Sequence, residues 1–113
     1  MPTDAQTVVD RQIEAYNAHD LDAFLSFYSS DAAYLRQSDG HVIFGGQQGL
    51  REAYGELFKA HPAVHVAIAN RIAIGRFVID LEHITGRTDI DAMQVVAIYE
   101  VADDLIQRVW VVR

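Results

Sequence analysis

Residues 77–87 read FVIDLEHITGR, and their types alternate. The alternation gives two sets, with Phe77, Ile79 and Leu81 on one side and Val78, Asp80 and Glu82 on the other. Because successive side chains of a strand face opposite sides of its sheet, Asp80 and Glu82 stand side by side on one face. That face is either open to water, as acids in half-exposed strands usually are, or the wall of a pocket.

The composition favours one globular domain, residues 1–113, with a sizeable core. Half of the 113 residues are hydrophobic, and the net charge is −7. The lysines and arginines are scattered along the chain, which argues against nucleic acid or an anionic membrane as a partner. We therefore expect a small apolar molecule or a protein as the partner.

Metal, cofactor and membrane chemistry receive no support from the sequence. Cysteine is absent, so there is no disulfide, thiol nucleophile or cysteine-ligated metal. His61 and His65 are four residues apart, but Pro62 lies between them, so a shared helical face is not expected.

The chain starts without a basic segment followed by an apolar core, and no apolar run approaches the roughly 20 residues of a membrane helix. We expect a cytoplasmic chain with no metal site and no cofactor.

The first half of the chain predicts mainly helices. Thr3 or Asp4 can cap a helix that ends near 17–19, with Gln6 completing a capping box behind Thr3. Asp20 can cap a short second helix that continues to Tyr28 and ends at 29–31. The remaining expected elements of this half are strands at 33–37 and 41–44 around a turn at 38–40, and a third helix closed by Pro62.

The second half predicts strands at 64–74, 77–85, 93–101 and 106–112, joined by short turns. Such spacing is typical of an antiparallel meander, and helices grouped before a sheet indicate an α+β fold. The last strands are apolar on both faces, so one face would remain exposed after the helices pack on the other. We therefore predict a homodimer formed sheet against sheet, with Trp110 as an anchor.

Three segments resemble one known superfamily: YNAHDLDAFLSFYSSDA at 16–32, GGQQGLREAYGELF at 45–58 and AIYEVADDLIQRVWVVR at 97–113. They are similar to the nuclear transport factor 2-like superfamily, specifically its SnoaL-like and ketosteroid-isomerase-like members. This resemblance implies a cone-shaped, curved antiparallel sheet wrapped around N-terminal helices, the cystatin-like arrangement, with an apolar cavity in the cone. The superfamily includes isomerases, dehydratases, hydrolases, polyketide cyclases and non-catalytic binders.

The catalytic residues of the ketosteroid isomerases are not matched. Ungapped alignment on NAHDLD and GLREAY places their oxyanion-hole tyrosine at Gln12, their base at Arg36 and their second acid at or near Ala97. Each of these parts typically contributes a factor of about a hundred or more to the rate. Ketosteroid isomerisation by that mechanism is therefore not expected.

The same alignment implies a different candidate site. It places Tyr34, Arg36, Val78, Asp80, Glu82, Ile84 and Tyr99 on the concave face, and Tyr16, Tyr28, Tyr54 and Phe58 on the helices that look into the cavity. Arg36 beside the two acids would keep one of them ionised as a base, and crowding could leave the other protonated as an acid. The predicted roles are Asp80 as base or water activator, Glu82 as acid partner and Arg36 as clamp. The predicted ligand-binding residues are Tyr16, Tyr28, Tyr34, Tyr54, Phe58, Val78 and Tyr99.

These residues lead to one main hypothesis and two alternatives. The main hypothesis is a cofactor-independent acid–base enzyme, of isomerase, dehydratase or hydrolase type, that acts on an apolar cyclic substrate. The alternatives are a non-catalytic ligand-binding protein that uses the same cavity and a dimeric scaffold whose cavity is filled by its own side chains.

Overall fold

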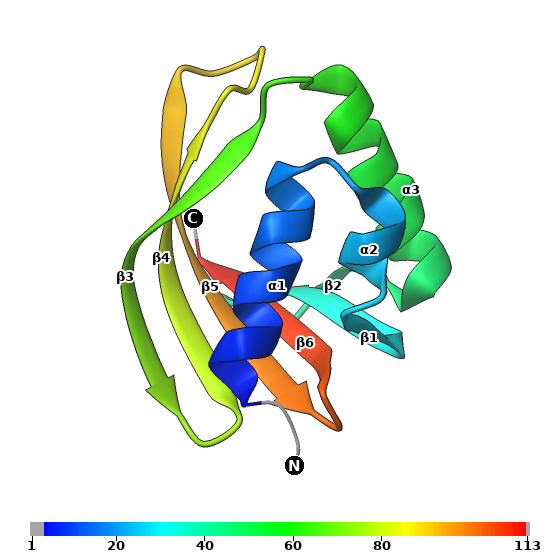
Figure 1. Ribbon diagram of the computed structural model, residues 1–113, viewed down its shortest axis with the longest axis vertical. Coiled ribbons are helices and arrows are strands. Elements are labelled where there is room, and N and C mark those ends of the chain that lie inside the picture. Colours follow the sequence, from blue (N-terminus) through cyan, green and yellow to red (C-terminus); the bar gives the residue numbers. More distant parts are fainter. Residues whose placement is uncertain (1–3, 113) are drawn as a thin grey trace.

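The helices form one layer on a curved sheet in the computed structural model, which describes residues 4–112 (Figure 1). The helices are α1 (Ala5–Asn17), α2 (Leu21–Leu25) and α3 (Gly46–Ala60). Asp4 caps α1 by accepting from the Thr7 amide at 2.8 Å, and Asp20 caps α2 by accepting from the Ala23 amide at 3.2 Å. Thr3 of the expected capping box lies outside the described residues. None of the helices in residues 4–112 is long and apolar enough to cross a membrane.

Six strands form one sheet: β1 (Tyr28–Arg36), β2 (Val42–Gly45), β3 (His65–Ile74), β4 (Phe77–Thr85), β5 (Ala92–Ala102) and β6 (Leu105–Val112), in the order β2-β1-β6-β5-β4-β3. The expected meander of the second half is confirmed, because β3 to β6 pair antiparallel in succession. The β1–β6 pair departs from the expected antiparallel sheet and is parallel. No hairpin joins these two strands, so no short turn sets their relative direction.

The second helix is shorter than the sequence predicts. It ends at Leu25, and Tyr28 begins β1 although it was expected on the helix. The segment 29–31, expected to be a helix end, belongs to the strand. Gln47 explains why this polar segment stays extended, since its amide donates to the backbone carbonyls of Leu25, Tyr28 and Ser29 at 3.2, 3.0 and 3.3 Å.

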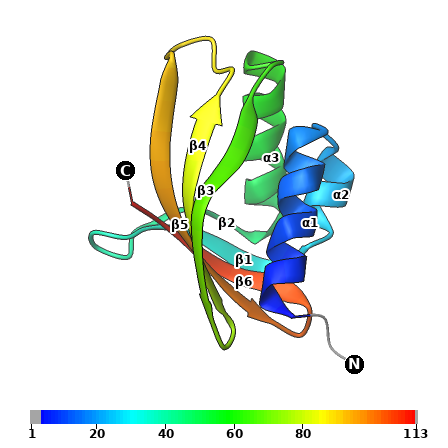
Figure 2. The ribbon, with the colours of Figure 1, turned by 60° about the vertical axis from the view of Figure 1, so that its left-hand side comes forward.

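The concave side of the sheet encloses the core (Figure 2). Irregular pairing in β3 after Ile68 and in β6 between Ile106 and Arg108 marks bulges, and such bulges bend strands and increase their twist. The curved sheet wraps around α1, which packs its apolar stripe of Val8 and Val9 against it. The expected fold of a curved sheet around N-terminal helices is confirmed.

The segment between β4 and β5 is held against the end of α3. The Thr88 amide donates to Nδ1 of His61 at 3.0 Å, and the Thr88 hydroxyl lies 2.9 Å from the same nitrogen. Gly86 has a φ of +80°, and a Cβ at this position would lie 1.8 Å from the carbonyl oxygen of Ala63. Only glycine allows this approach between the two segments.

We predict that Gly86→Ala lowers the free energy of unfolding by about 3–4 kcal/mol, because it adds a backbone clash to the left-handed strain. Gly40 is a matched control: its φ is +71°, and a Cβ there would meet nothing within 4 Å. Gly40→Ala should cost only about 1 kcal/mol. Urea unfolding of both variants measures the difference, and equal losses would contradict a steric requirement at Gly86.

Candidate functional site

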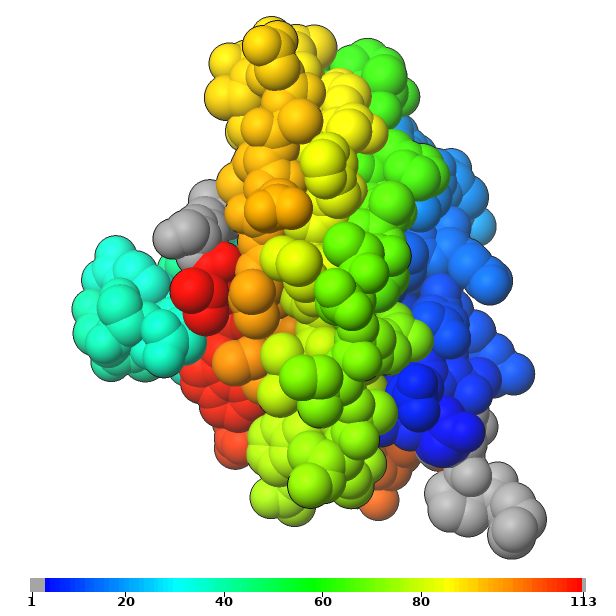
Figure 3. All heavy atoms as spheres, turned by 90° about the vertical axis from the view of Figure 1, so that its left-hand side faces the viewer, coloured from blue at the N-terminus to red at the C-terminus, as the bar shows by residue number. Residues whose placement is uncertain are grey.

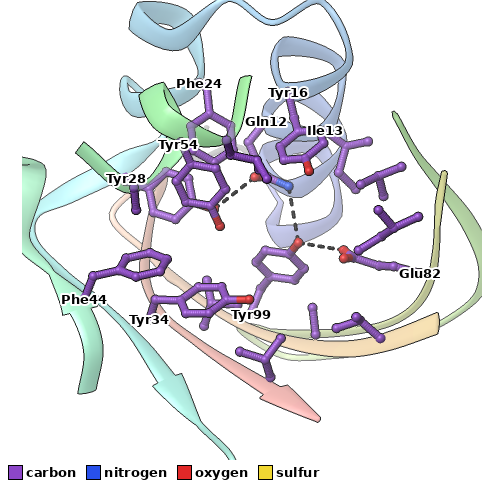
Figure 4. Close-up of a pocket in the computed structure, with 18 of the residues that line it drawn as sticks. Gln12, Ile13, Tyr16, Phe24, Tyr28, Tyr34, Phe44, Tyr54, Glu82 and Tyr99 are labelled. Carbon is purple, nitrogen blue, oxygen red and sulfur yellow. Dashed lines mark hydrogen bonds between the residues drawn. The ribbon is translucent and has the colours of Figure 1, made fainter. Parts of the chain in front are cut away.

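A cavity of about 180 Å³ lies between the helices and the concave face of the sheet (Figure 4). Its wall is mostly apolar and aromatic, and Glu82 and Arg87 are the charged side chains among the described residues that line it. The lining residues are Gln12, Ile13, Tyr16, Phe24, Tyr28, Tyr34, Phe44, Ala53, Tyr54, Leu57, Val66, Glu82, Ile84, Arg87, Met93, Val95, Ala97, Tyr99, Val109 and Val111.

A chain of hydrogen bonds runs along one side of this cavity and ends at Glu82 (Figure 4). The Tyr28 hydroxyl donates to Oε1 of Gln12 at 3.0 Å, and the Gln12 amide donates to the Tyr99 hydroxyl at 3.5 Å. The Tyr99 hydroxyl in turn donates to Oε2 of Glu82 at 2.7 Å. Every donor in this series points toward Glu82. The last hydrogen bond, from Tyr99, is therefore donated to the carboxylate and favours its ionised form.

Burial nevertheless dominates the acidity of Glu82. The residue is 7% exposed, and loss of solvation raises the pKa of its carboxyl group to about 7. The Tyr99 hydrogen bond and the charge of Arg71 lower this pKa, whereas the negative charge of Asp80 raises it. Glu82 therefore changes its protonation state near neutral pH, where an acid or base must do so to transfer protons efficiently.

The tyrosine hydroxyls of the cavity remain protonated beside Glu82. Burial raises the pKa of Tyr16, Tyr28, Tyr54 and Tyr99 above the ordinary value, and the charge of Glu82 raises each of them further. These hydroxyls are therefore hydrogen-bond donors over the whole physiological pH range.

Asp80 faces the same side of β4 as Glu82 but lies outside the cavity. Its side chain is fully buried, and Arg71 of β3 binds it with Nε at 2.6 Å from Oδ1 and a second nitrogen at 2.9 Å from Oδ2. Arg71 also binds Asp10 of α1 at 2.5 Å. Because Asp80 and Glu82 are both buried, the alternative that they lie on a solvated face is wrong. Arg71 links β4 to α1, since it binds both Asp80 and Asp10.

Arg36 does not join the acids. It pairs with Asp39 of the adjoining turn at 2.7 Å, and its side chain is 53% exposed. It lines a separate hollow beside Ile43 and Val112. The predicted grouping of Arg36 with Asp80 and Glu82 is therefore not formed, because the Asp39 carboxylate lies three residues from Arg36 and holds its guanidinium at the surface.

The predicted ligand-binding residues separate into two groups. Tyr16, Tyr28, Tyr34, Tyr54 and Tyr99 line the cavity. Phe58 does not, because its ring packs 5.2 Å from that of Tyr16 and stacks 4.7 Å from His19. Val78 is fully buried in the core.

Three polar side chains in or beside the site were missed as site residues. Gln12 was noted only as a mismatch, although a buried amide needs partners and here finds two tyrosines. Arg87 lines the cavity while its guanidinium binds both oxygens of Asp89, at 2.9 and 2.7 Å. Arg71 could have been found, because the tight turn at 75–76 pairs it directly with Asp80. Within residues 4–112, no group of three or more histidine, aspartate or glutamate side chains could hold a metal ion.

We predict that Glu82 makes stability depend on pH. Its pKa is about 7 in the folded protein against an ordinary value of 4.5, so between these values the folded state keeps a proton that the unfolded state releases. The free energy of unfolding therefore falls as the pH rises from about 4.5 to about 7, and is then constant. Relative to wild type, Glu82→Gln should gain roughly 2–4 kcal/mol between about pH 4.5 and about pH 8. Urea unfolding of both proteins measures this difference, and a constant difference would contradict the raised pKa.

Comparison with known proteins adds the family. A profile of the SnoaL-like domain matches residues 9–109. No curated protein sequence matches the chain.

Solved structures show the same fold over nearly the whole chain. An uncharacterised cystatin-fold protein from Novosphingobium aromaticivorans is 29% identical, with a TM-score of 0.90 over 98% of this chain and 99% of that one. A provisionally assigned ketosteroid isomerase from Kribbella flavida is 16% identical, with a TM-score of 0.80 over 95% of this chain and 75% of that one. A provisionally assigned polyketide cyclase from Sinorhizobium meliloti is 15% identical, with a TM-score of 0.80 over 94% of each chain. With the profile match covering most of the sequence, this chain belongs to the SnoaL-like family.

Proposed function

We propose that this protein is an acid–base enzyme that acts on an apolar cyclic molecule in the cavity, with Glu82 as the group that transfers the proton. One observation carries the proposal: a buried carboxyl group lines an apolar cavity, with a pKa of about 7. Isomerisation, dehydration and hydrolysis can all include such a transfer, and the proposal concerns this shared step. The provisional names of similar structures, an isomerase and a polyketide cyclase, agree with cyclic substrates.

The tyrosines supply the electrostatic part of the proposed reaction. When Glu82 removes a proton from the substrate, negative charge develops on a substrate oxygen. The hydroxyls of Tyr16 and Tyr54 point into the cavity and can donate to that oxygen (Figure 4). Donors that are already fixed in a site with little water stabilise such charge without reorganising.

Asp80 and Arg36 have different roles in this proposal from those the sequence predicts. Asp80 acts at a distance, because its negative charge helps to raise the pKa of Glu82. Its own oxygens are bound by Arg71, so it is not the base. Arg36 has no role in the proposed chemistry, since its guanidinium is paired at the surface.

A non-catalytic binding protein is the second candidate function. The hydrogen-bonded chain through Gln12 supports it, because a carboxylate held by Tyr99 at 2.7 Å is also suited to fixing a ligand without reacting. Proton exchange in a bound ligand distinguishes the two functions.

The test of the enzyme is exchange of α-hydrogens for deuterium in a panel of cyclic ketones, followed by NMR in deuterated water. We expect exchange that increases with pH through about 7 and that falls about a hundredfold or more in Glu82→Gln. Arg36→Gln, which changes a residue outside the cavity, should retain the wild-type rate. Ketones that bind without exchanging their hydrogens would support the non-catalytic binding protein. An exchange rate in Glu82→Gln equal to that of wild type would show that Glu82 does not transfer the proton.

We also propose that a second copy of the chain covers the convex face of the sheet (Figure 3). Strand pairing aligns Ile72, Ile79, Ile98, Trp110 and Leu35 in one row across five strands. Ile72 is 65% exposed. A row of apolar side chains on a sheet face can pack on its own copy about a two-fold axis, which is the commonest symmetry of homodimers.

Ile98→Asp should convert the proposed dimer into a monomer, because each copy would place a charge at the centre of the apolar row. Light scattering after size-exclusion chromatography measures the mass. Val42→Asp is the control, since Val42 is 50% exposed and lies on β2, outside the row. A monomeric wild type, or a dimer that survives Ile98→Asp, would contradict the proposal.

A further inference from the structure

We propose that the ligand of the cavity is a neutral single-ring compound with a hydroxyl group, of the phenol or enol class, and that this hydroxyl donates its hydrogen bond to Glu82. This inference rests on the proposed function for the location of the site. It goes further by specifying the size, charge and polar group of the ligand.

The size follows from the volume of the cavity. It measures about 180 Å³. An engineered apolar cavity of about 150 Å³ binds benzene, so this one has room for one ring with small substituents. A compound of four fused rings would require the helices to move away from the sheet.

The walls suit a flat ring. Tyr16 and Tyr54 meet edge to face with ring centroids 6.1 Å apart, and Phe44 meets Tyr54 in the same way at 5.7 Å. Aromatic rings in such arrangements present both edges and faces to a neighbour, and a further ring can continue the packing at favourable geometry.

The polar groups define what the ligand must carry. The hydroxyls of Tyr28 and Tyr99 already donate to Gln12 and Glu82. Within residues 4–112, the hydroxyls of Tyr16 and Tyr54 donate to no other residue, and both point into the cavity (Figure 4). They are donors without an acceptor, whereas ionised Glu82 is an acceptor, so the best complement is one oxygen that both accepts and donates. A phenol or enol hydroxyl has this property, and a ketone acquires it on forming the enol.

The charges favour a neutral ligand. Arg87 is the cationic side chain among the described lining residues, and its charge is paired with Asp89, whose two oxygens accept from Nε and one terminal nitrogen of the guanidinium. An anionic ligand would therefore meet ionised Glu82 without a free cation to offset the repulsion. An amine cation would be attracted to Glu82, but it would leave the Tyr16 and Tyr54 hydroxyl protons without an acceptor.

The test is isothermal titration calorimetry with p-cresol as the probe. 4-Methylanisole is the matched ligand, because it keeps the ring and the oxygen but has no proton to donate. We expect p-cresol to bind about tenfold or more tightly than 4-methylanisole, benzylamine or the four-ring phenol estradiol. Affinity for p-cresol should increase from about pH 5.5 to about pH 8 as Glu82 ionises, and this dependence should vanish in Glu82→Gln. Arg36→Gln should bind like wild type.

Three results would overturn the inference. Equal binding of 4-methylanisole would show that no proton is donated, tighter binding of benzylamine would indicate a cation site, and tighter binding of estradiol would contradict the size limit. The proposed function fails separately: p-cresol bound as expected, with no ketone exchanging its protons, would leave the inference intact and make the protein a carrier. If only multi-ring ketones exchange their hydrogens and p-cresol does not bind, the proposed function stands and the inference about the ligand fails.

Discussion

Two carboxyl groups lie two residues apart on the concave face of β4, and one half-buried guanidinium, that of Arg71, binds the first of them directly and acts on the second only through its charge. Arg71 binds both oxygens of Asp80 and leaves Glu82 with a tyrosine hydroxyl as its nearest polar partner. A carboxyl group that loses water without binding a cation directly becomes a weaker acid, because burial disfavours its ionised form. Because Arg71 binds Asp80 and not Glu82, Glu82 is the acid with the raised pKa, and the chemistry available to the cavity depends on it.

The same guanidinium also organises the structure around the site. Arg71 belongs to β3, Asp80 to β4 and Asp10 to α1, so a single side chain holds the first helix across two strands. α1 in turn carries Gln12 and Tyr16 to the cavity wall. A buried ion pair gains little net stability over an apolar pair of the same volume, but removing one partner is costly. The second partner of Arg71, Asp10 on α1, is 55% exposed, so this contact contributes to the position of the helix more than to stability.

The sequence predicted the fold in most respects, because the signals were local. Alternation along 77–85 identified β4 and its two acids, and the third helix expected before Pro62 is α3. The family resemblance supplied the curvature and the cavity, which periodicity alone does not contain. All five predicted tyrosines lie in its wall, although Tyr28 comes from β1 and not from a helix.

The incorrect predictions of site residues have two causes. Some contacts join residues that are far apart in the sequence, and one joins residues only three positions apart. Asp39 binds Arg36 from three residues away, and that local pair removed Arg36 from the predicted site. The chain through Gln12 joins residues from α1, β1 and β5, which no local pattern brings together. The short second helix was overextended because Tyr28 fits a helical stripe as well as it fits the start of a strand. Each of these outcomes was decided by tertiary contacts.

The parallel pairing of β1 with β6 has a consequence for the order of folding. β6 lies between β1 and β5. The early strands β1 and β2 therefore cannot pair with the later strands β3 to β5 until residues 105–112 are present. The α-helical layer and the hairpins can form from near neighbours, but the complete sheet depends on pairing between β1 and β6, at positions such as Tyr34 and Val109 that are 75 residues apart in the sequence. The cavity wall is therefore incomplete until β6 has docked beside β1, because both strands contribute lining residues.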